Sequence, residues 1–191
     1  MSLSDNIFES SNLLRRVALC AAFGLAMTLS ACQVRPLYGS GTGEFGTTSS
    51  PVTTEMAAID LDSIDSKFAN EDASRVLYNE LTYRFERGAG SPAKRYRLKI
   101  LMDVGNSEVG VEQFADVPSA YTTTMNTTFV LSDINSDETL MTGRAFKSAS
   151  YDFSDQRFAN QRAYRNAQER VAKAVADDIA ARIAGYFASR S

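Results

Sequence analysis

The first hydrophobic stretch of the chain, residues 17–28, is apolar or small throughout except for the threonine at its end. A polar segment that ends in Arg15 and Arg16 precedes it, and small residues follow it. The stretch is too short to cross the hydrocarbon core of a bilayer, which needs about 20 apolar residues. A positive start, a short apolar stretch and small residues are typical of a secretory signal peptide. We therefore expect residues 1–31 to be a cleaved signal that is not part of the fold.

Regular hydrophobic patterning starts after a segment of very different composition. Residues 39–54 are nearly all Gly, Ser, Thr or Pro, which is typical of a flexible tether. Beyond it, Ile59 and Leu61 share one face of a short alternating run, which predicts a first strand.

A helix is predicted next. Asn70 is a suitable N-cap residue, and Glu71 and Asp72 in the first turn suit the positive end of the helix dipole. Apolar residues recur at helical spacing, at Ala73, Val76, Leu77, Leu81 and Phe85. The Gly- and Pro-containing run at 88–92 ends the helix.

Three strands are predicted after the helix. In the first, apolar and basic positions alternate: Tyr96, Leu98, Ile100, Met102 and Val104 on one side, Arg95, Arg97 and Lys99 on the other. Apolar residues at Val109 and Val111 allow this strand to continue beyond Gly105. The second, residues 121–132, has Tyr121, Met125, Phe129 and Leu131 on one face and Thr122, Thr124, Asn126 and Thr128 on the other. A turn at 135–137 leads into the third, residues 140–153, whose alternation is less regular.

A long helix, from about residue 155 to residue 188, closes the chain. Branched or aromatic residues recur every four positions, at Val171, Val175, Ile179, Ile183 and Phe187, with alanines beside them. The polar side carries both signs of charge, which favours packing on a sheet over lying on a membrane surface.

This order predicts an α+β fold, a two-layer sandwich with a four-stranded, mostly antiparallel sheet and two helices on one face (β-α-β-β-β-α). The other sheet face, rich in Thr, Arg and Lys, is then left uncovered. We expect a signal peptide at 1–31, an N-terminal tether at 32–55 and one domain at 56–191.

Composition narrows the chemistry. The 191-residue chain has no His, and its formal net charge is −3. His is the most common general base and metal ligand, and no Cys/His cluster or G-x-S-x-G motif is present. Cys20 leaves with the signal, so Cys32 has no disulfide partner. We expect no enzyme activity, no cofactor, no metal site and no nucleic-acid partner.

The residues at the expected cleavage site give the first specific indication of function. Residues 29–32, Leu-Ser-Ala-Cys, resemble the lipobox of bacterial lipoproteins, which implies thioether lipidation of Cys32 and cleavage just before it. Because more than one acyl chain is needed for stable anchoring, such an N-terminus would hold the protein on a membrane. Gln33 stands where an Asp would resemble the inner-membrane retention signal, so we expect the outer membrane. The alternative is a secreted protein that carries a cysteine there by chance.

The mature N-terminus resembles the lipopolysaccharide-assembly lipoprotein family LptE in its alphaproteobacterial form. The cysteine runs into Arg35-Pro36-Leu37-Tyr38-Gly39, where that family has R-P-L-Y-G. Weaker matches lie at Ala149–Asp152, Phe158-Ala159 and Ala184–Phe187, and the element order agrees. The resemblance implies a non-enzymatic protein in the lumen of the outer-membrane barrel LptD, which helps to assemble the barrel and to insert lipopolysaccharide into the outer leaflet.

Two other functions remain open. One is a lipoprotein accessory subunit of an ABC-type lipid transport system, which would have a permease or lipid-shuttle domain as its partner. The other is a periplasmic hydrolase that uses Asp152, Ser154 and Asp155, although these residues are better explained as the cap of the last helix.

The candidate ligand site is basic. Arg95, Arg97 and Lys99 project at two-residue steps, and Arg144 or Lys147 from the last strand is expected to extend the patch. Arginine binds phosphate through paired charge-assisted hydrogen bonds, and lipopolysaccharide carries phosphates on lipid A. The alternative is a solvated strand face whose charges prevent pairing with other chains.

Overall fold

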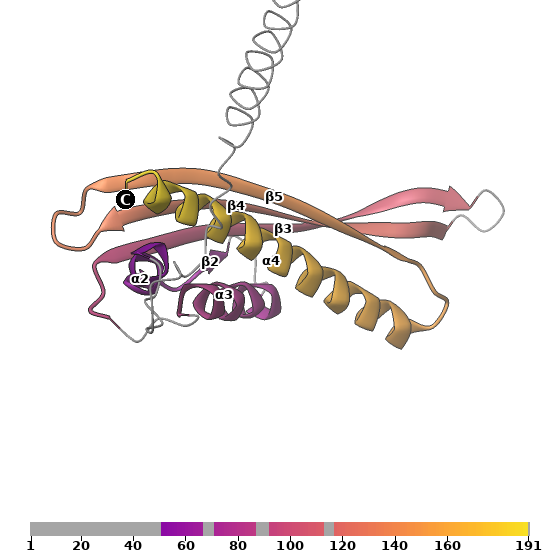
Figure 1. Ribbon diagram of the computed structural model, residues 1–191. Coiled ribbons are helices and arrows are strands. Elements are labelled where there is room, and N and C mark those ends of the chain that lie inside the picture. The colour runs from indigo at the N-terminus through magenta and orange to yellow at the C-terminus, as the bar shows by residue number, and fades with distance from the viewer. Residues whose placement is uncertain (1–50, 67–70, 87–91, 113–116, 191) are drawn as a thin grey trace, which may run out of the picture. The chain divides into compact units, whose positions relative to one another are not determined.

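The computed structural model describes residues 51–66, 71–86, 92–112 and 117–190 (Figure 1). All of them belong to one of the two compact units of the chain, Leu37–Ser191. The expected signal peptide, Cys32 and the R-P-L-Y-G run lie outside the described residues, as does the helix cap expected at Asn70.

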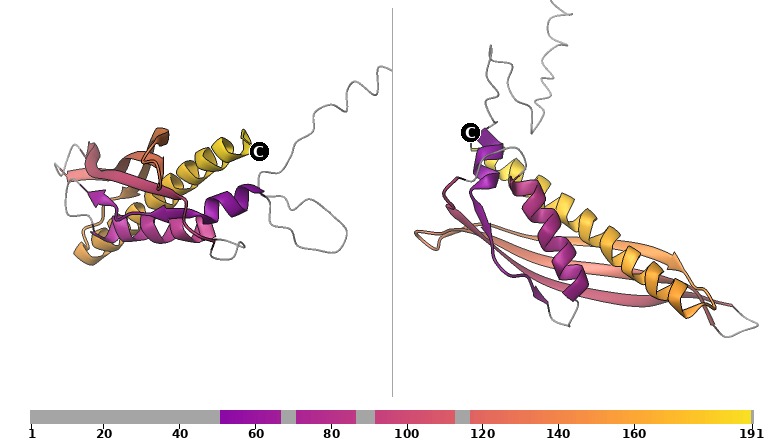
Figure 2. Two further views of the ribbon diagram at one scale, coloured as in Figure 1. Left: turned by 90° about the vertical axis from the view of Figure 1, so that its left-hand side faces the viewer. Right: turned by 90° about the horizontal axis from the view of Figure 1, so that it is seen from below.

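The predicted α+β sandwich is confirmed. Along the chain the elements are α2 (Pro51–Ala57), β1 (Ile59–Leu61), β2 (Asp65–Ser66), α3 (Glu71–Glu86), β3 (Tyr96–Glu112), β4 (Val117–Asp133), β5 (Thr139–Asp152) and α4 (Arg157–Ala188). Strands β3, β4 and β5 are antiparallel neighbours, and β1 and β2 both pair in parallel with the same edge of β3. The sheet is therefore four positions wide, and α3 and α4 lie on one side of it (Figure 2).

The expected first strand is divided into two short pieces. Leu61 pairs with Leu98 and Asp65 pairs with Leu101, so this edge has one more residue than β3 over the same length. The extra residue interrupts the pairing, and the Asp62 carboxylate accepts a 3.0 Å hydrogen bond from the N–H of Ser63 in the break. Such a bulge bends an edge strand and interrupts its hydrogen-bond ladder.

The last residues assigned to the tether are helical. Helix α2 starts at Pro51, which suits a first turn because its missing N–H would have no partner there. Val52 and Met56, four residues apart, are buried against the domain core, with exposed fractions of 6% and 1%. The tether prediction was therefore wrong for residues 51–55, because two apolar residues at helical spacing outweigh the Thr-rich composition once a core is available.

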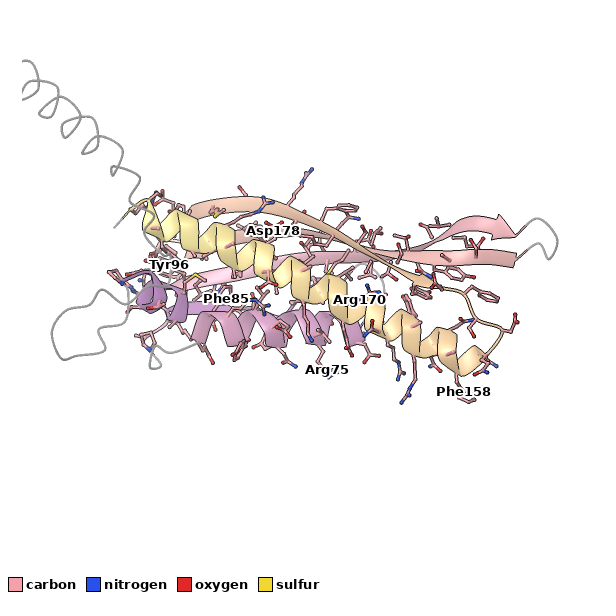
Figure 3. All side chains as sticks on the ribbon, turned by 45° about the vertical axis from the view of Figure 1, so that its right-hand side comes forward. Arg75, Phe85, Tyr96, Phe158, Arg170 and Asp178 are labelled. Carbon is pink, nitrogen blue, oxygen red and sulfur yellow. The ribbon has the colours of Figure 1, made fainter. Side chains whose placement is uncertain are left out.

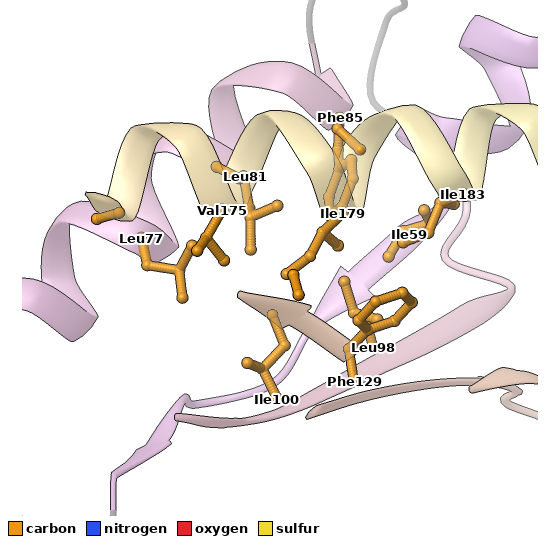
Figure 4. Close-up of a cluster of buried hydrophobic side chains, with 14 of the residues drawn as sticks. Ile59, Leu77, Leu81, Phe85, Leu98, Ile100, Phe129, Val175, Ile179 and Ile183 are labelled. Atoms are coloured by element: carbon orange, nitrogen blue, oxygen red, sulfur yellow. The ribbon is translucent and has the colours of Figure 1, made fainter. Parts of the chain in front are cut away.

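The core lies between the sheet and the helices (Figure 4). The predicted inward residues of β3 and β4 are buried, among them Leu98, Ile100, Met125 and Phe129. From α3 come Leu77, Leu81 and Phe85, and from α4 the predicted stripe at Val171, Val175, Ile179 and Ile183. Because the alanines beside that stripe are buried too, α4 approaches the sheet closely. The periodicity therefore predicted the core correctly.

The boundaries agree with expectation for β3 and differ for β4 and α4. Strands β3 and β4 have 17 residues each, so β3 does continue past Gly105, and β4 begins before Tyr121. Helix α4 begins at Arg157, with Gln156 as its N-cap and no side-chain cap hydrogen bond. In the ranges that the structure describes, no helix has an apolar run long enough to cross a membrane.

Candidate functional site: the uncovered face of the sheet

The sheet face opposite α3 and α4 is open in the part of the chain that the structure describes (Figures 1 and 2). Strand register places its side chains in cross-strand rows. Arg97 lies opposite Ser132, Lys99 opposite Val130, and Leu101 opposite Thr128, which in turn lies opposite Arg144. The remaining positions on β4 and β5 are mostly Thr and Ser. The face is therefore polar, as the sequence predicted.

Arg97 and Lys99 both lie on this face. Lys99 is exposed, and Arg97 reaches Asp137 in the turn after β4 at an Nη1–Oδ1 distance of 3.9 Å. That contact is long and exposed, and such pairs contribute little to stability. Both cations are therefore available to an anionic ligand.

Arg95 is not available in the same way. It precedes β3, and its guanidinium donates a 2.6 Å hydrogen bond to the Glu55 carboxylate, which also accepts a 2.7 Å hydrogen bond from the Tyr96 hydroxyl. Partial burial alone would raise the pKa of Glu55, but these hydrogen bonds outweigh it and leave that pKa below its ordinary value. The same hydrogen bond raises the pKa of Arg95. The structure thus uses Arg95 to hold α2 against the start of β3.

The last strand contributes one of the two alternative cations. Arg144 is exposed on the open face, whereas Lys147 projects to the helix side and lies 3.8 Å from Asp178 of α4. A hydrogen bond from Arg182 and the charge of Lys147 keep the pKa of Asp178 (Figure 3) below its ordinary value. The open basic group is therefore Arg97, Lys99 and Arg144. Arg144 lies two strands across and one row along from Lys99, roughly 12 Å away.

Carboxylates border this group. Asp60 of β1 pairs with Arg97 in the register, and Asp65 of β2 pairs with Leu101. Sequence alternation alone did not reveal these neighbours, because they depend on parallel pairing between distant segments. The charged end of the face thus carries both signs.

The residues considered for a hydrolase form a turn. The Ser154 hydroxyl oxygen accepts a 3.2 Å hydrogen bond from the Gln156 N–H, and the Ser154 N–H donates a 2.8 Å bond to Asn160. Asp152 and Asp155 are exposed. These contacts support the turn before α4 and do not cap the helix itself, so the cap prediction was wrong in detail. Within the described ranges, no three His, Cys, Asp or Glu side chains are grouped as a metal site.

Removing the two open strand cations tests the phosphate hypothesis. Arg97→Ser combined with Lys99→Ser is expected to weaken binding to purified lipopolysaccharide by about tenfold or more at low salt, since each hydrogen bond between charged groups is worth about 1.5–3 kcal/mol. The difference should shrink as salt rises. Lys147→Ser, on the opposite face, is the matched control. Equal affinities of the double variant and the native chain at low salt would remove these residues from any ligand site.

Comparisons with known proteins identify the fold. No protein-family model matches the chain, and no curated protein matches it. A crystal structure of a candidate lipoprotein from Caulobacter crescentus CB15 matches with a TM-score of 0.55 and 21% identity, over 74% of this chain and 98% of that one. Rare lipoprotein B from Shewanella oneidensis matches with a TM-score of 0.45 and 14% identity, over 69% of this chain and 96% of that one. A minor lipoprotein from Acinetobacter baumannii has a TM-score of 0.46 and 16% identity, over 65% and 90%. The Caulobacter match shows that the two proteins share a fold, and all three of these similar structures are named as lipoproteins.

Proposed function

We propose that this chain is an outer-membrane lipoprotein, acylated at Cys32, that lies in the lumen of an LptD-type β-barrel. There it supports assembly of the barrel and takes part in inserting lipopolysaccharide into the outer leaflet. The acyl chains hold it at the periplasmic side of the membrane. It acts as a binding and assembly partner and not as an enzyme.

The open sheet face is the observation that carries this proposal. The helices α3 and α4 bury the domain's core on the other face, so the domain is able to fold before it meets a partner. The open face carries Thr, Ser and charged side chains across β3, β4 and β5. A barrel lumen is polar and wet, and such a face suits it without desolvating unpaired charges.

The N-terminal sequence supplies the second line of support. Leu29–Cys32 resembles a lipobox, and Arg35–Gly39 resembles the start of LptE proteins. Helix α2, which begins at Pro51, packs against α3 and α4. Residues 51–57, the described residues nearest in sequence to Cys32, are therefore part of the packed domain.

Depletion of the protein in its native cell tests the proposal. The expected result is a misfolded barrel and reduced lipopolysaccharide at the cell surface, with the inner-membrane transporter unchanged. The measurements are heat-modifiable barrel migration and surface labelling of lipopolysaccharide. A correctly folded barrel together with impaired phospholipid traffic would instead identify an accessory subunit of an ABC-type lipid transport system.

A further inference from the structure

A single cross-strand row on the open face combines an aromatic ring, an amide and a carboxylate. Phe146 of β5 lies opposite Asn126 of β4, and Asn126 lies opposite Asp103 of β3. Phe146 is 58% exposed, although its neighbours Ala145 and Lys147 project to the helix side. Phenylalanine has a large apolar surface and no polar group of its own. Phe146 therefore does not contribute buried apolar surface to the domain's own core.

The polar members of the row are not used within the domain. In the ranges that the structure describes, the Asp103 carboxylate and the Asn126 amide have no hydrogen-bond or ion-pair partner, and Phe146 has no ring contact. Further along the same face the hydroxyls of Thr122 and Ser150 do pair, at 2.8 Å. Other polar side chains of the face, among them Thr124, Thr128 and Ser148, likewise have no partner within the described ranges, so the row differs from them in its aromatic ring, amide and carboxylate.

The dimensions and chemistry of the row suit a sugar ring. Neighbouring strands are about 4.8 Å apart, so the row extends roughly 10 Å from Asp103 to Phe146, enough for one or two pyranose rings. A carboxylate accepts hydrogen bonds from sugar hydroxyls, and an amide both donates and accepts. The C–H face of a pyranose packs on an aromatic ring, which supplies apolar area with few rotamers to immobilise.

We propose that the row Asp103–Asn126–Phe146 binds the saccharide part of lipopolysaccharide. One sugar ring lies on Phe146, and its hydroxyls are hydrogen-bonded to Asn126 and Asp103. Arg144, two residues before Phe146 on the same face, and Thr124 and Ser148 in the next row supply further polar contacts. The choice of lipopolysaccharide over other glycans rests on the proposed function.

Other ligands fit the row less well. An acyl chain requires a continuous apolar groove, whereas Phe146 is surrounded by Thr124, Thr128, Arg144 and Ser148. A phosphate prefers Arg97 and Lys99, which lie farther along the sheet, beyond the Leu101 row. A lone exposed phenylalanine is common and has no meaning by itself. Its position in one row with a carboxylate and an amide, Asp103 and Asn126, distinguishes this one.

The test uses the full-length chain in detergent micelles and the lipid-free core oligosaccharide released from lipopolysaccharide by mild acid. Saturation-transfer NMR is expected to show transfer to the sugar protons. Phe146→Ala should weaken binding about tenfold, the effect of losing one aromatic contact, and Asn126→Ala and Asp103→Asn should each weaken it severalfold. Phe158→Ala is the matched control, since Phe158 is 82% exposed in the first turn of α4 (Figure 3). It should bind as the native chain does.

Several results would overturn the inference. One is that the oligosaccharide does not bind to the native chain. Another is that Phe146→Ala binds it as tightly as the native chain does. Equal binding of peptidoglycan fragments would show that the source of the sugar is wrong. Loss of a dimer in Phe146→Ala would make the row an interface between copies. If the protein supports barrel assembly but does not bind the oligosaccharide, the proposed function stands and only this binding site is wrong. If it binds the oligosaccharide but does not support barrel assembly, the site stands and the proposed function is wrong.

Discussion

Replacing Phe129 by alanine is expected to lower the free energy of unfolding by about 3–5 kcal/mol. Phe129 lies in the second half of β4 and is fully buried between the sheet and the helices (Figure 4). The cost combines the lost burial of the ring with the cavity that remains, because a close-packed core relaxes only in part. Urea-induced unfolding of residues 51–191, followed by circular dichroism, measures it. A loss below 1 kcal/mol would mean that this core is packed differently.

The ring of Phe129 also explains a glycine on the next strand. Gly143 lies opposite Phe129 in the register, and a Cβ atom there would come within 2.7 Å of the ring's Cε1. Gly143→Ala is therefore expected to destabilise the native chain by about 1–3 kcal/mol through overpacking. In the Phe129→Ala background the methyl group has room, so the cost should disappear and the two effects should not add. Gly185→Ala in α4, where a Cβ meets nothing within 4 Å, is the control and should stabilise by about 0.4–1 kcal/mol.

Cys32→Ala is expected to have an all-or-none effect on processing. Without the thiol no thioether-linked lipid can form, so the lipoprotein peptidase has no substrate and the precursor keeps residues 1–31. Intact-mass analysis of the membrane fraction measures the result. Cys20→Ala is the matched control, because that cysteine lies within the expected signal peptide. An unmodified mature N-terminus in the native chain would contradict lipidation.

Local periodicity was sufficient to predict most of the fold. The alternation at Leu98, Ile100 and Met102, and the four-residue stripe from Val171, each specify one buried face without knowledge of the rest of the chain. The polar face of β4 was predicted correctly for the same reason. These predictions hold because the spacing of residues within one helix or strand determines which of them share a face.

Features that depend on distant segments were missed. Arg95 continues the alternation of Arg97, but the strand begins after it, and Glu55, 40 positions earlier, binds its guanidinium. Lys147 was predicted as an alternative to Arg144 in the basic patch, but it lies on the helix side, because β5 alternates less regularly and only its pairing with β4 fixes which face each residue takes. Helix α2 was missed because the Thr- and Pro-rich composition around it predicts a flexible segment. Burial of Val52 becomes favourable only when the rest of the core is present.

The candidate site was predicted in part. The sequence indicated a polar open face with basic residues, and the structure confirms that Arg97 and Lys99 lie on it. It did not indicate the row of Asp103, Asn126 and Phe146, whose members are about 20 positions apart. Only the strand register brings them together. A cross-strand site of this kind leaves no signal in a single sequence.

The most direct test of the central claim is mass spectrometry of what co-purifies with the intact chain from native membranes in mild detergent. The chain acylated at Cys32 is predicted to carry a lipopolysaccharide-exporting outer-membrane barrel at one-to-one stoichiometry, whereas Cys32→Ala should lose most of it. Recovery of a permease or a lipid-shuttle domain in place of a barrel would contradict the account.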